Sequence, residues 1–230
     1  MMNAKHTLSK STKPLTCEVS PDEFTLASEK AFDCSFSGVS KFYPWELPQD
    51  DLLNDFSLGV IVGGSGTGKS TLLRQFGIEE VPVWESDKAV VSHFDSPDTA
   101  INRLMAVGLN TVPSWYKPYS VLSNGEKFRA DLARKIKHNA VIDEFTSVVD
   151  RNVAKAASVA LSRYVKKHNL KNVVVSTCHH DIVDWLQPDW VINTDTGHLY
   201  DGFFLSDQKS NLKSIKQTAV SGQCLKTIII

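Results

Sequence analysis

The sequence predicts an α/β fold in which a parallel sheet is covered by helices on both faces. The first observation is that four segments, 58–62, 89–93, 140–142 and 173–177, are apolar along most of their length, as strands buried on both faces are. The second is that helical patterns separate these segments, which is typical of parallel sheets. Such sheets bind ligands at the carboxyl ends of their strands, so functional residues are expected there.

Composition sets the broad class of the protein. The chain has 230 residues, 42% of them apolar, and a net charge of −1. This length suits one α/β domain or two small ones, and the charge gives no overall bias towards nucleic acid or membranes. Its four cysteines are scattered and form no Cys-x-x-Cys pair, so neither a disulfide framework nor a zinc ribbon is indicated. No apolar run approaches the roughly 18 residues of a membrane span. We therefore expect a cytoplasmic protein.

Composition changes at both ends of the chain. Residues 1–28 are rich in Ser, Thr and Lys and contain two prolines, so a mostly disordered leader is expected. Residues 29–205 hold the periodic segments and form the predicted domain, in which alternation within 32–36 indicates a half-buried strand. Residues 206–230 form a basic tail. A flexible, solvated tail is the expectation, and a tail that binds a partner is the alternative.

The segment from Gly63 to Ser70 fits the phosphate-binding pattern of Gly, four residues and Gly-Lys-Ser. An apolar run over 58–62 predicts a buried strand entering this loop, and 71–76 predicts a helix leaving it. Glycines let successive N–H groups point at phosphate oxygens, and the helix N-terminus adds partial positive charge. Lys69 is expected at the β- and γ-phosphates and the Ser70 hydroxyl at Mg²⁺. The alternative is a glycine-rich turn that binds nothing. The expected phosphate-binding residues are Gly63, Gly64, Ser65, Gly66, Thr67, Gly68, Lys69, Ser70 and Thr71.

The remaining elements follow in order. The sequence predicts a helix from Ser96 or Asp98, a helix that carries Phe128, a long helix over about 151–168, and closing strands near 190–192 and 199–204. Asp143, Glu144 and His179 lie just past two of the strand ends, so they can share one crevice with the phosphate-binding loop.

From about Phe36 to Gly202 the chain resembles the nucleotide-binding domain of ABC-type ATPases. The resemblance implies a phosphate-loop NTPase of ABC type, with a three-layer core, an N-terminal antiparallel β part and a helical subdomain, here reduced to about 96–126. It also implies ATP and Mg²⁺ as cofactors and ATP hydrolysis as the activity.

Asp143 and Glu144 follow an apolar strand and look like the Walker B element of that family. Adjacent acids at a strand end point in different directions, so Asp143 can face Ser70 and Mg²⁺ while Glu144 polarises the attacking water. Phe145 stands where the family usually has Pro. The alternative is a pair of solvated carboxylates.

The stretch from Leu122 to Glu126 resembles the family signature, in which Ser123 and Gly125 would face the γ-phosphate bound on a second subunit. It departs from the family at Asn124, usually Gly, and at Glu126, often Gln. An ordinary Ser N-cap with a capping acid is the alternative.

Three further positions match family elements. Tyr43 lies where the family stacks adenine on an aromatic ring, although Phe42 and Trp45 are near. Asp150 ends a loop that passes between subunits in the family, and capping of the next helix is the other interpretation. His179 resembles the switch histidine that touches the γ-phosphate. His180 competes for this role, although it could instead pair with Asp181.

The sequence lacks parts that serve transport in the family. No Gln lies between Gln75 and Leu122, and the interval from Lys69 to Ser123 is about half as long as in transporters. This shortened form is similar to a soluble ABC ATPase group whose longer members carry an acetyltransferase-like domain. A membrane permease partner is therefore disfavoured.

The expected function is that of a soluble Mg-ATPase that forms a head-to-tail homodimer around two ATP molecules and switches an unidentified protein partner. One alternative is the ATP-binding subunit of an ABC membrane transporter. The other is a nucleic-acid maintenance or phage-associated ATPase that uses basic groups such as Arg129 and Arg134.

Overall fold

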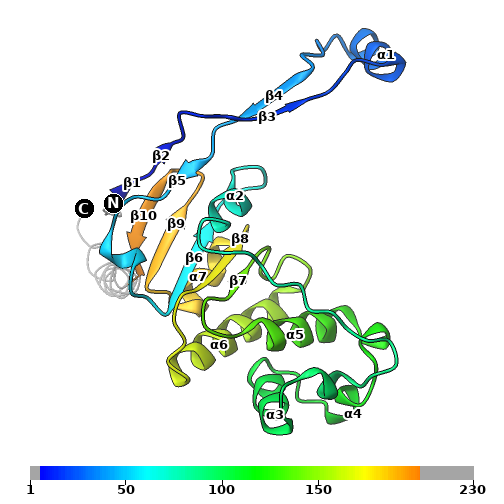
Figure 1. The fold of residues 1–230 in the computed structure, drawn as a ribbon, viewed down its shortest axis with the longest axis vertical. Coiled ribbons are helices and arrows are strands. Elements are labelled where there is room, and N and C mark those ends of the chain that lie inside the picture. The colour runs from blue at the N-terminus through cyan, green and yellow to red at the C-terminus, as the bar shows by residue number, and fades with distance from the viewer. Residues whose placement is uncertain (1–5, 203–230) are drawn as a thin grey trace, which may run out of the picture.

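A six-stranded sheet forms the centre of the computed structural model, which describes residues 6–202 (Figure 1). The strand order is β1-β10-β9-β6-β8-β7. Strands β9, β6, β8 and β7 run parallel to one another. Strand β10 pairs antiparallel with β9, and β1 pairs antiparallel with β10 at the edge of the sheet. The strands are β1 (His6–Thr7), β6 (Leu58–Val62), β7 (Val141–Ile142), β8 (Val173–Thr177), β9 (Trp190–Asn193) and β10 (His198–Asp201).

Two hydrophobic cores cover the two faces of this sheet, which confirms the predicted three-layer arrangement. Alternate residues of β6 point to opposite faces, as in any strand. Val60 and Val62 join a core with α5 and α6, whereas Ile61 joins a second core that contains Trp190. The helices are α2 (Lys69–Leu73), α3 (Pro97–Ala106), α4 (Val112–Trp115), α5 (Asn124–Lys135), α6 (Arg151–Lys167) and α7 (Val183–Leu186). The 3₁₀ turns are η1 (Asp51–Leu53), η2 (Val90–His93), η3 (Tyr119–Val121) and η4 (His180–Ile182).

Local sequence signals explain where the main helices begin. Ser96 caps α3 by accepting a hydrogen bond from the Thr99 N–H, and Pro97 occupies the first turn, where its missing donor costs nothing. Asp150 caps α6, whose buried stripe repeats every three or four residues. These helices agree with the sequence predictions. The stripe consists of Ala154, Ala157, Ser158, Leu161, Ser162 and Val165.

Residues 89–93 do not form the predicted buried strand. The segment is the 3₁₀ turn η2, in which the Ser92 N–H bonds to the Ala89 carbonyl and the Val90 N–H bonds to Lys117. The apolar run is short, and such a run cannot be assigned to a strand by periodicity alone. Its Val90 packs into the core with α3 and α5 and not beside a strand of the sheet. In Figure 1, α3 and α4 lie at the end of the molecule below α5, as the reduced helical subdomain.

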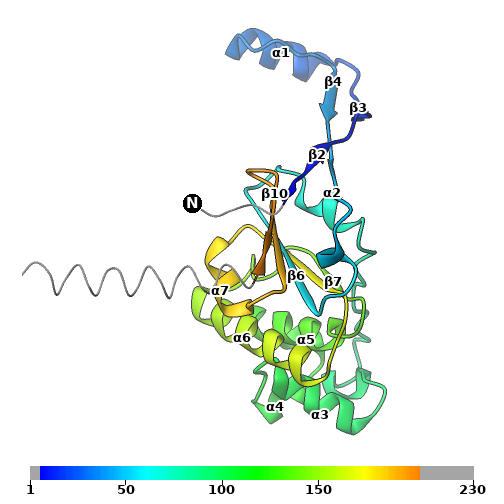
Figure 2. The same cartoon turned by 90° about the vertical axis from the view of Figure 1, so that its left-hand side faces the viewer.

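The N-terminal segment is structured, and the expectation of a disordered leader over 1–28 is wrong for residues 6–28. Strand β1 adds to the sheet edge, and β2 (Ser9–Lys10) pairs with β5 (Trp45–Glu46). Beyond them, β3 (Leu15–Glu18) pairs with β4 (Val39–Phe42), and α1 (Glu23–Phe32) lies at the tip. We call residues 15–42 the arm. Figures 1 and 2 show it projecting away from the domain.

The half-buried strand predicted over 32–36 is also absent from the structure, because α1 extends to Phe32. Asp22 and Thr25 form a capping box that starts this helix. Asp33 ends it in the left-handed region, and the Glu29 carboxylate then accepts the Phe36 N–H. The closing strands are as predicted up to Asp201. The basic tail over 206–230 lies outside the described residues.

Candidate functional site

The loop between β6 and α2 has the backbone that a phosphate-binding loop needs. Gly66 and Gly68 have φ angles of 76° and 94°, where a Cβ is penalised. A Cβ on Gly68 would also lie 2.5 Å from the Phe42 ring. The Lys69 ammonium donates to the Gly64 carbonyl at 2.5 Å, so it reaches back over the loop. Ser65, Ser70 and Thr71 belong to the same loop and the start of α2.

The turn between β9 and β10 contacts and supports this loop. These contacts were not predicted from the sequence. The Gly64 N–H donates to the Asp195 carboxylate at 2.8 Å. The buried Thr194 hydroxyl donates to the Val62 carbonyl at 3.1 Å and lies 2.7 Å from the Thr67 hydroxyl. These contacts join positions about 130 residues apart, so no local pattern could have indicated them.

Asp143, at the end of β7, is brought to the phosphate-binding loop. Burial by itself would raise the pKa of Asp143. Hydrogen bonds from the Ser176 and Ser70 hydroxyls and the Glu144 N–H, together with the charge of Lys69, outweigh burial and hold the pKa below its usual value. Asp143 is therefore a carboxylate at neutral pH, in contact with the hydroxyl that the sequence predicts as its Mg²⁺-binding partner.

Glu144 is exposed and has an unusual backbone. Its φ of 48° lies in the left-handed region, and its N–H donates to Asp143 at 2.9 Å and to the Ser176 hydroxyl at 3.3 Å. Non-glycine residues in this region cluster at functional sites, where neighbouring contacts hold them. Thr146 is also left-handed, and its hydroxyl lies 3.5 Å from Nδ1 of His179. The structure thus brings His179 next to the segment that carries Glu144.

His180 does not pair with Asp181. Its Nε2 lies 3.4 Å from the Asp195 carboxylate, while Asp181 forms an ion pair with Arg151. Asp195 thus contacts both the phosphate-binding loop and His180. The ion pair is explained by the start of α6, which presents Arg151 to the η4 turn.

Ser123 is the N-cap of α5, so the capping interpretation holds. The Ser123 N–H and hydroxyl donate to the Glu126 carboxylate at 2.9 and 2.8 Å, and the Ser114 hydroxyl donates to it at 2.6 Å. The hydrogen bond from Ser114 is the first cause that lowers the pKa of Glu126 to about 2, followed by those from Ser123. Gly125 lies in the first turn of this helix.

Aromatic side chains meet the phosphate-binding loop from the side of the arm. The Trp45 indole N–H donates to the Thr67 carbonyl at 3.2 Å, and the Phe42 ring packs on Gly68. The Lys10 ammonium lies 3.5 Å from the centre of the Trp45 ring. Tyr43, the expected adenine-stacking residue, is 46% exposed. Asp150 accepts the N–H groups of Asn152 and Val153, which is its capping role.

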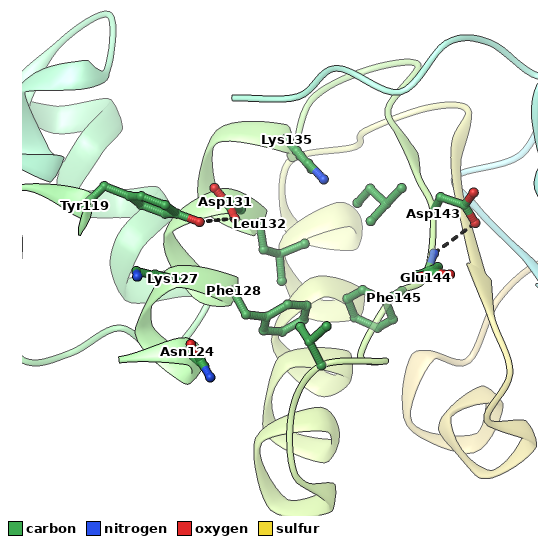
Figure 3. A pocket seen from close by; sticks show the side chains of 12 residues that line it. Tyr119, Asn124, Lys127, Phe128, Asp131, Leu132, Lys135, Asp143, Glu144 and Phe145 are labelled. Atoms are coloured by element: carbon green, nitrogen blue, oxygen red, sulfur yellow. Dashed lines mark hydrogen bonds between the residues drawn. The ribbon is translucent and has the colours of Figure 1, made fainter. Parts of the chain in front are cut away.

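A cavity of about 440 Å³ connects the two acids to α5. Figure 3 shows Asp143 and Glu144 on one side and Asn124 and Lys127 on the other, with the Phe128 and Phe145 rings between them. The two ring centres are 5.9 Å apart. The cavity thus opens a path between the end of β7 and the helix that Ser123 caps.

Comparison with known proteins identifies the fold. A scan of protein-family models gave no match, and a search of curated proteins found no relative. Among solved structures, the dimeric form of MJ0796, a bacterial ABC transporter cassette, matches with a TM-score of 0.50 and 16% identity over 67% of this chain and 87% of that chain. This chain has the fold of an ABC ATP-binding cassette.

A second structure of MJ0796 and another cassette agree with this assignment. A dimeric post-hydrolysis state of MJ0796 bound to ADP and Pi matches with a TM-score of 0.51 and 12% identity, over 81% of this chain and 93% of that chain. The structure of cbiO1 from Clostridium perfringens, part of the cbiONQ transporter complex, matches with a TM-score of 0.51 and 19% identity, over 77% and 86%. At these identities the likeness concerns the fold.

The donor set beside the phosphate-binding loop fits Mg²⁺. A hard cation of this kind takes oxygen ligands, and the Ser70 hydroxyl and the Asp143 carboxylate supply them side by side. The described part of the chain holds no group of three His, Cys, Asp or Glu side chains suited to a metal. In residues 6–202, no helix combines the length and apolarity needed to cross a membrane.

Proposed function

We propose that this cassette binds and hydrolyses ATP with Mg²⁺, and that two copies close head to tail around two ATP molecules. The observation that carries the proposal is the contact between Ser70 and Asp143, which joins the phosphate-binding loop to the end of β7 with Glu144 beside it. Phosphate-loop NTPases use a loop that cradles the phosphates beside a Mg²⁺-holding carboxylate to transfer a phosphoryl group to water.

Each residue has a defined part in this proposal. Lys69 leaves the Gly64 carbonyl and binds the β- and γ-phosphates, and the N–H groups of the loop hold their oxygens. Ser70 and Asp143 hold Mg²⁺, which neutralises charge on the phosphates when bound. Glu144 takes a proton from the attacking water.

Two further residues are proposed to contact the γ-phosphate and the adenine ring of ATP. His179 contacts the γ-phosphate in this proposal, which its place beside Thr146, in the segment that follows Glu144, supports. Tyr43 stacks on adenine, at the side of the loop where Phe42 and Trp45 already pack.

The second copy completes the site. Ser123 and Gly125 stand at the N-terminus of a 12-residue helix, whose free N–H groups and partial positive charge favour an anion. In the closed dimer they face the γ-phosphate held by the other copy, and Asp150 lies in the loop between the copies. Hydrolysis removes this shared ligand, so the dimer opens and switches an unidentified protein partner.

The test is the turnover of the Glu144→Gln protein. If Glu144 is the base, turnover falls by about 10²- to 10⁴-fold, while ATP still binds. Glu85→Gln is the matched control, because the Glu85 side chain forms an exposed ion pair with Lys88. A Glu144→Gln turnover within a few-fold of wild type would remove the base assignment, and wild-type turnover no higher than in EDTA would remove the ATPase assignment.

A further inference from the structure

We propose that the arm is a clasp for the second copy of this chain, and that it docks beside the N-terminus of the partner's α5. The proposal rests on the head-to-tail dimer proposed above and adds a contact outside the nucleotide site. It names the surface that holds the two copies together while ATP is bound.

The arm lacks the packing that would stabilise it within one copy. No residue of α1 is buried, and Phe24 and Phe32 are 73% and 80% exposed. A helix of ten residues and a ribbon of four residue pairs are both marginal in water. Exposed aromatic side chains on such a segment indicate a surface that is covered in an assembly.

The position of the arm indicates that its binding partner is a second copy of this chain. Strand β4 ends at Phe42, whose ring packs on Gly68, so the arm leaves the domain at the phosphate-binding loop. This loop is the face that Ser123 of the second copy approaches in the proposed dimer. The ribbon spans about 13 Å and α1 about 15 Å. These lengths are enough for the arm to reach past the nucleotide onto the second copy, and the proposal places its tip next to the start of α5.

The two surfaces have complementary chemistry. Residues 18–33 contain five carboxylates and one lysine, in addition to the exposed phenylalanines. Tyr116 and Val121, which precede Ser123, are 68% and 62% exposed, and Lys127 and Arg129 follow it in α5. An acidic, aromatic arm thus meets an apolar patch flanked by two basic side chains.

Other basic groups of this region are already engaged within the chain. Lys135 pairs with Glu79 at 2.6 Å and Lys137 with Glu80 at 2.5 Å. In the part of the chain that the structure describes, Lys127 and Arg129 form no ion pair, although Lys127 lies 5.7 Å from the centre of the Tyr119 ring. Lys127 and Arg129 are therefore available to an acidic arm, and the Glu126 carboxylate on the same turn is already bound by Ser114 and Ser123.

The first experiment measures the dissociation constant of the ATP-bound dimer by sedimentation, in the Glu144→Gln background. Replacing Phe24 and Phe32 by Ser is expected to raise this constant at least tenfold, because aromatic anchors dominate interfaces. The affinity of the monomer for ATP is expected to stay unchanged. Met105→Ser is the matched control, since Met105 is an exposed apolar residue of α3, at the other end of the domain.

Charge reversal gives the decisive comparison. Glu18→Lys with Glu23→Lys on the arm, and Lys127→Glu with Arg129→Glu on α5, are each expected to weaken the dimer at least tenfold. All four together are expected to restore the dissociation constant to within about threefold, because each reversed arm then meets a reversed α5.

Each outcome decides between the two proposals. A dimer whose affinity does not change with the arm, or a quadruple variant no tighter than its parents, would overturn the clasp and leave the ATP-dependent dimer intact. A monomer in every sample, including Glu144→Gln with Mg-ATP, would overturn the dimer and the clasp together.

Discussion

The brace between Thr194 and the phosphate-binding loop leads to a quantitative prediction. Thr194→Val keeps the shape of the buried side chain and removes its hydroxyl. Two contacts are lost, the one to the Val62 carbonyl at 3.1 Å and the one to the Thr67 hydroxyl at 2.7 Å. Each net hydrogen bond contributes about 1 kcal/mol, so the free energy of unfolding is expected to fall by about 2 kcal/mol. For a chain of this size that lowers Tm by about 4–8 °C.

The same substitution tests whether the brace preorganises the nucleotide site. The contact to Thr67 acts on the loop itself, because the Thr67 hydroxyl, which donates to Thr194 when Thr194 donates to Val62, also lies 2.9 Å from the Gly64 carbonyl. This contact stabilises the binding conformation of the loop by about 1 kcal/mol. If ATP binding has to supply that free energy in the variant, the Kd for ATP rises about fivefold.

Calorimetry gives Tm, and titration with a fluorescent ATP analogue gives Kd. Thr194→Ser is the control, since it keeps the hydroxyl and is expected to bind ATP within twofold of wild type. A Thr194→Val protein with a lower Tm but an unchanged Kd would refute the reasoning, because the brace would then stabilise the fold without shaping the loop.

Two further substitutions test the packing and electrostatics of the fold. Hydrogen bonds, first from Ser114, lower the pKa of Glu126 from 4.5 to about 2, so its carboxylate stabilises the fold above pH 4.5 and this contribution is lost as pH falls towards 2. Glu126→Gln is therefore expected to be less stable than wild type at pH 7 in urea unfolding, with a gap that narrows below pH 4.5; a constant gap would contradict the assignment. Gly59→Ala places a Cβ 2.0 Å from the buried Trp190 ring and is expected to cost about 1–3 kcal/mol. In urea unfolding Gly125→Ala, whose Cβ would meet only Arg129 at 3.8 Å, serves as the control, and equal stabilities of the two proteins would show that Trp190 moves freely.

The sequence predicted the parts of the site that depend on local patterns. The loop from Gly63 to Ser70 was recognisable because a buried strand and a helix flank it, and both flanks are present. Helices α5 and α6 carry their own capping residues and apolar stripes, and their starts were predictable for that reason. The acids at Asp143 and Glu144 followed from the end of a strand.

Other features depend on contacts between distant residues or lack a local signal. Residues 15–28 of the arm have the composition of a disordered leader, and the capping pair Asp22 and Thr25 is the local signal that could have indicated the helix. The pairing of His180 with Asp195 is made by the turn between β9 and β10, which no spacing along the chain reveals. Residues 89–93 had the apolarity of a strand, but they form a 3₁₀ turn that packs against α3 and α4.

The most direct test of the account is complementation between two inactive proteins. Lys69→Ala disables the phosphate-binding loop and Ser123→Arg blocks the start of α5, so each homodimer has two defective sites. In a head-to-tail dimer the mixed pair places both defects in one site and leaves the other intact. A mixture of the two is therefore expected to recover up to about a quarter of wild-type turnover, because half of the dimers are mixed and each has one working site. A mixture no more active than either protein alone would contradict the shared site and leave each copy to act by itself.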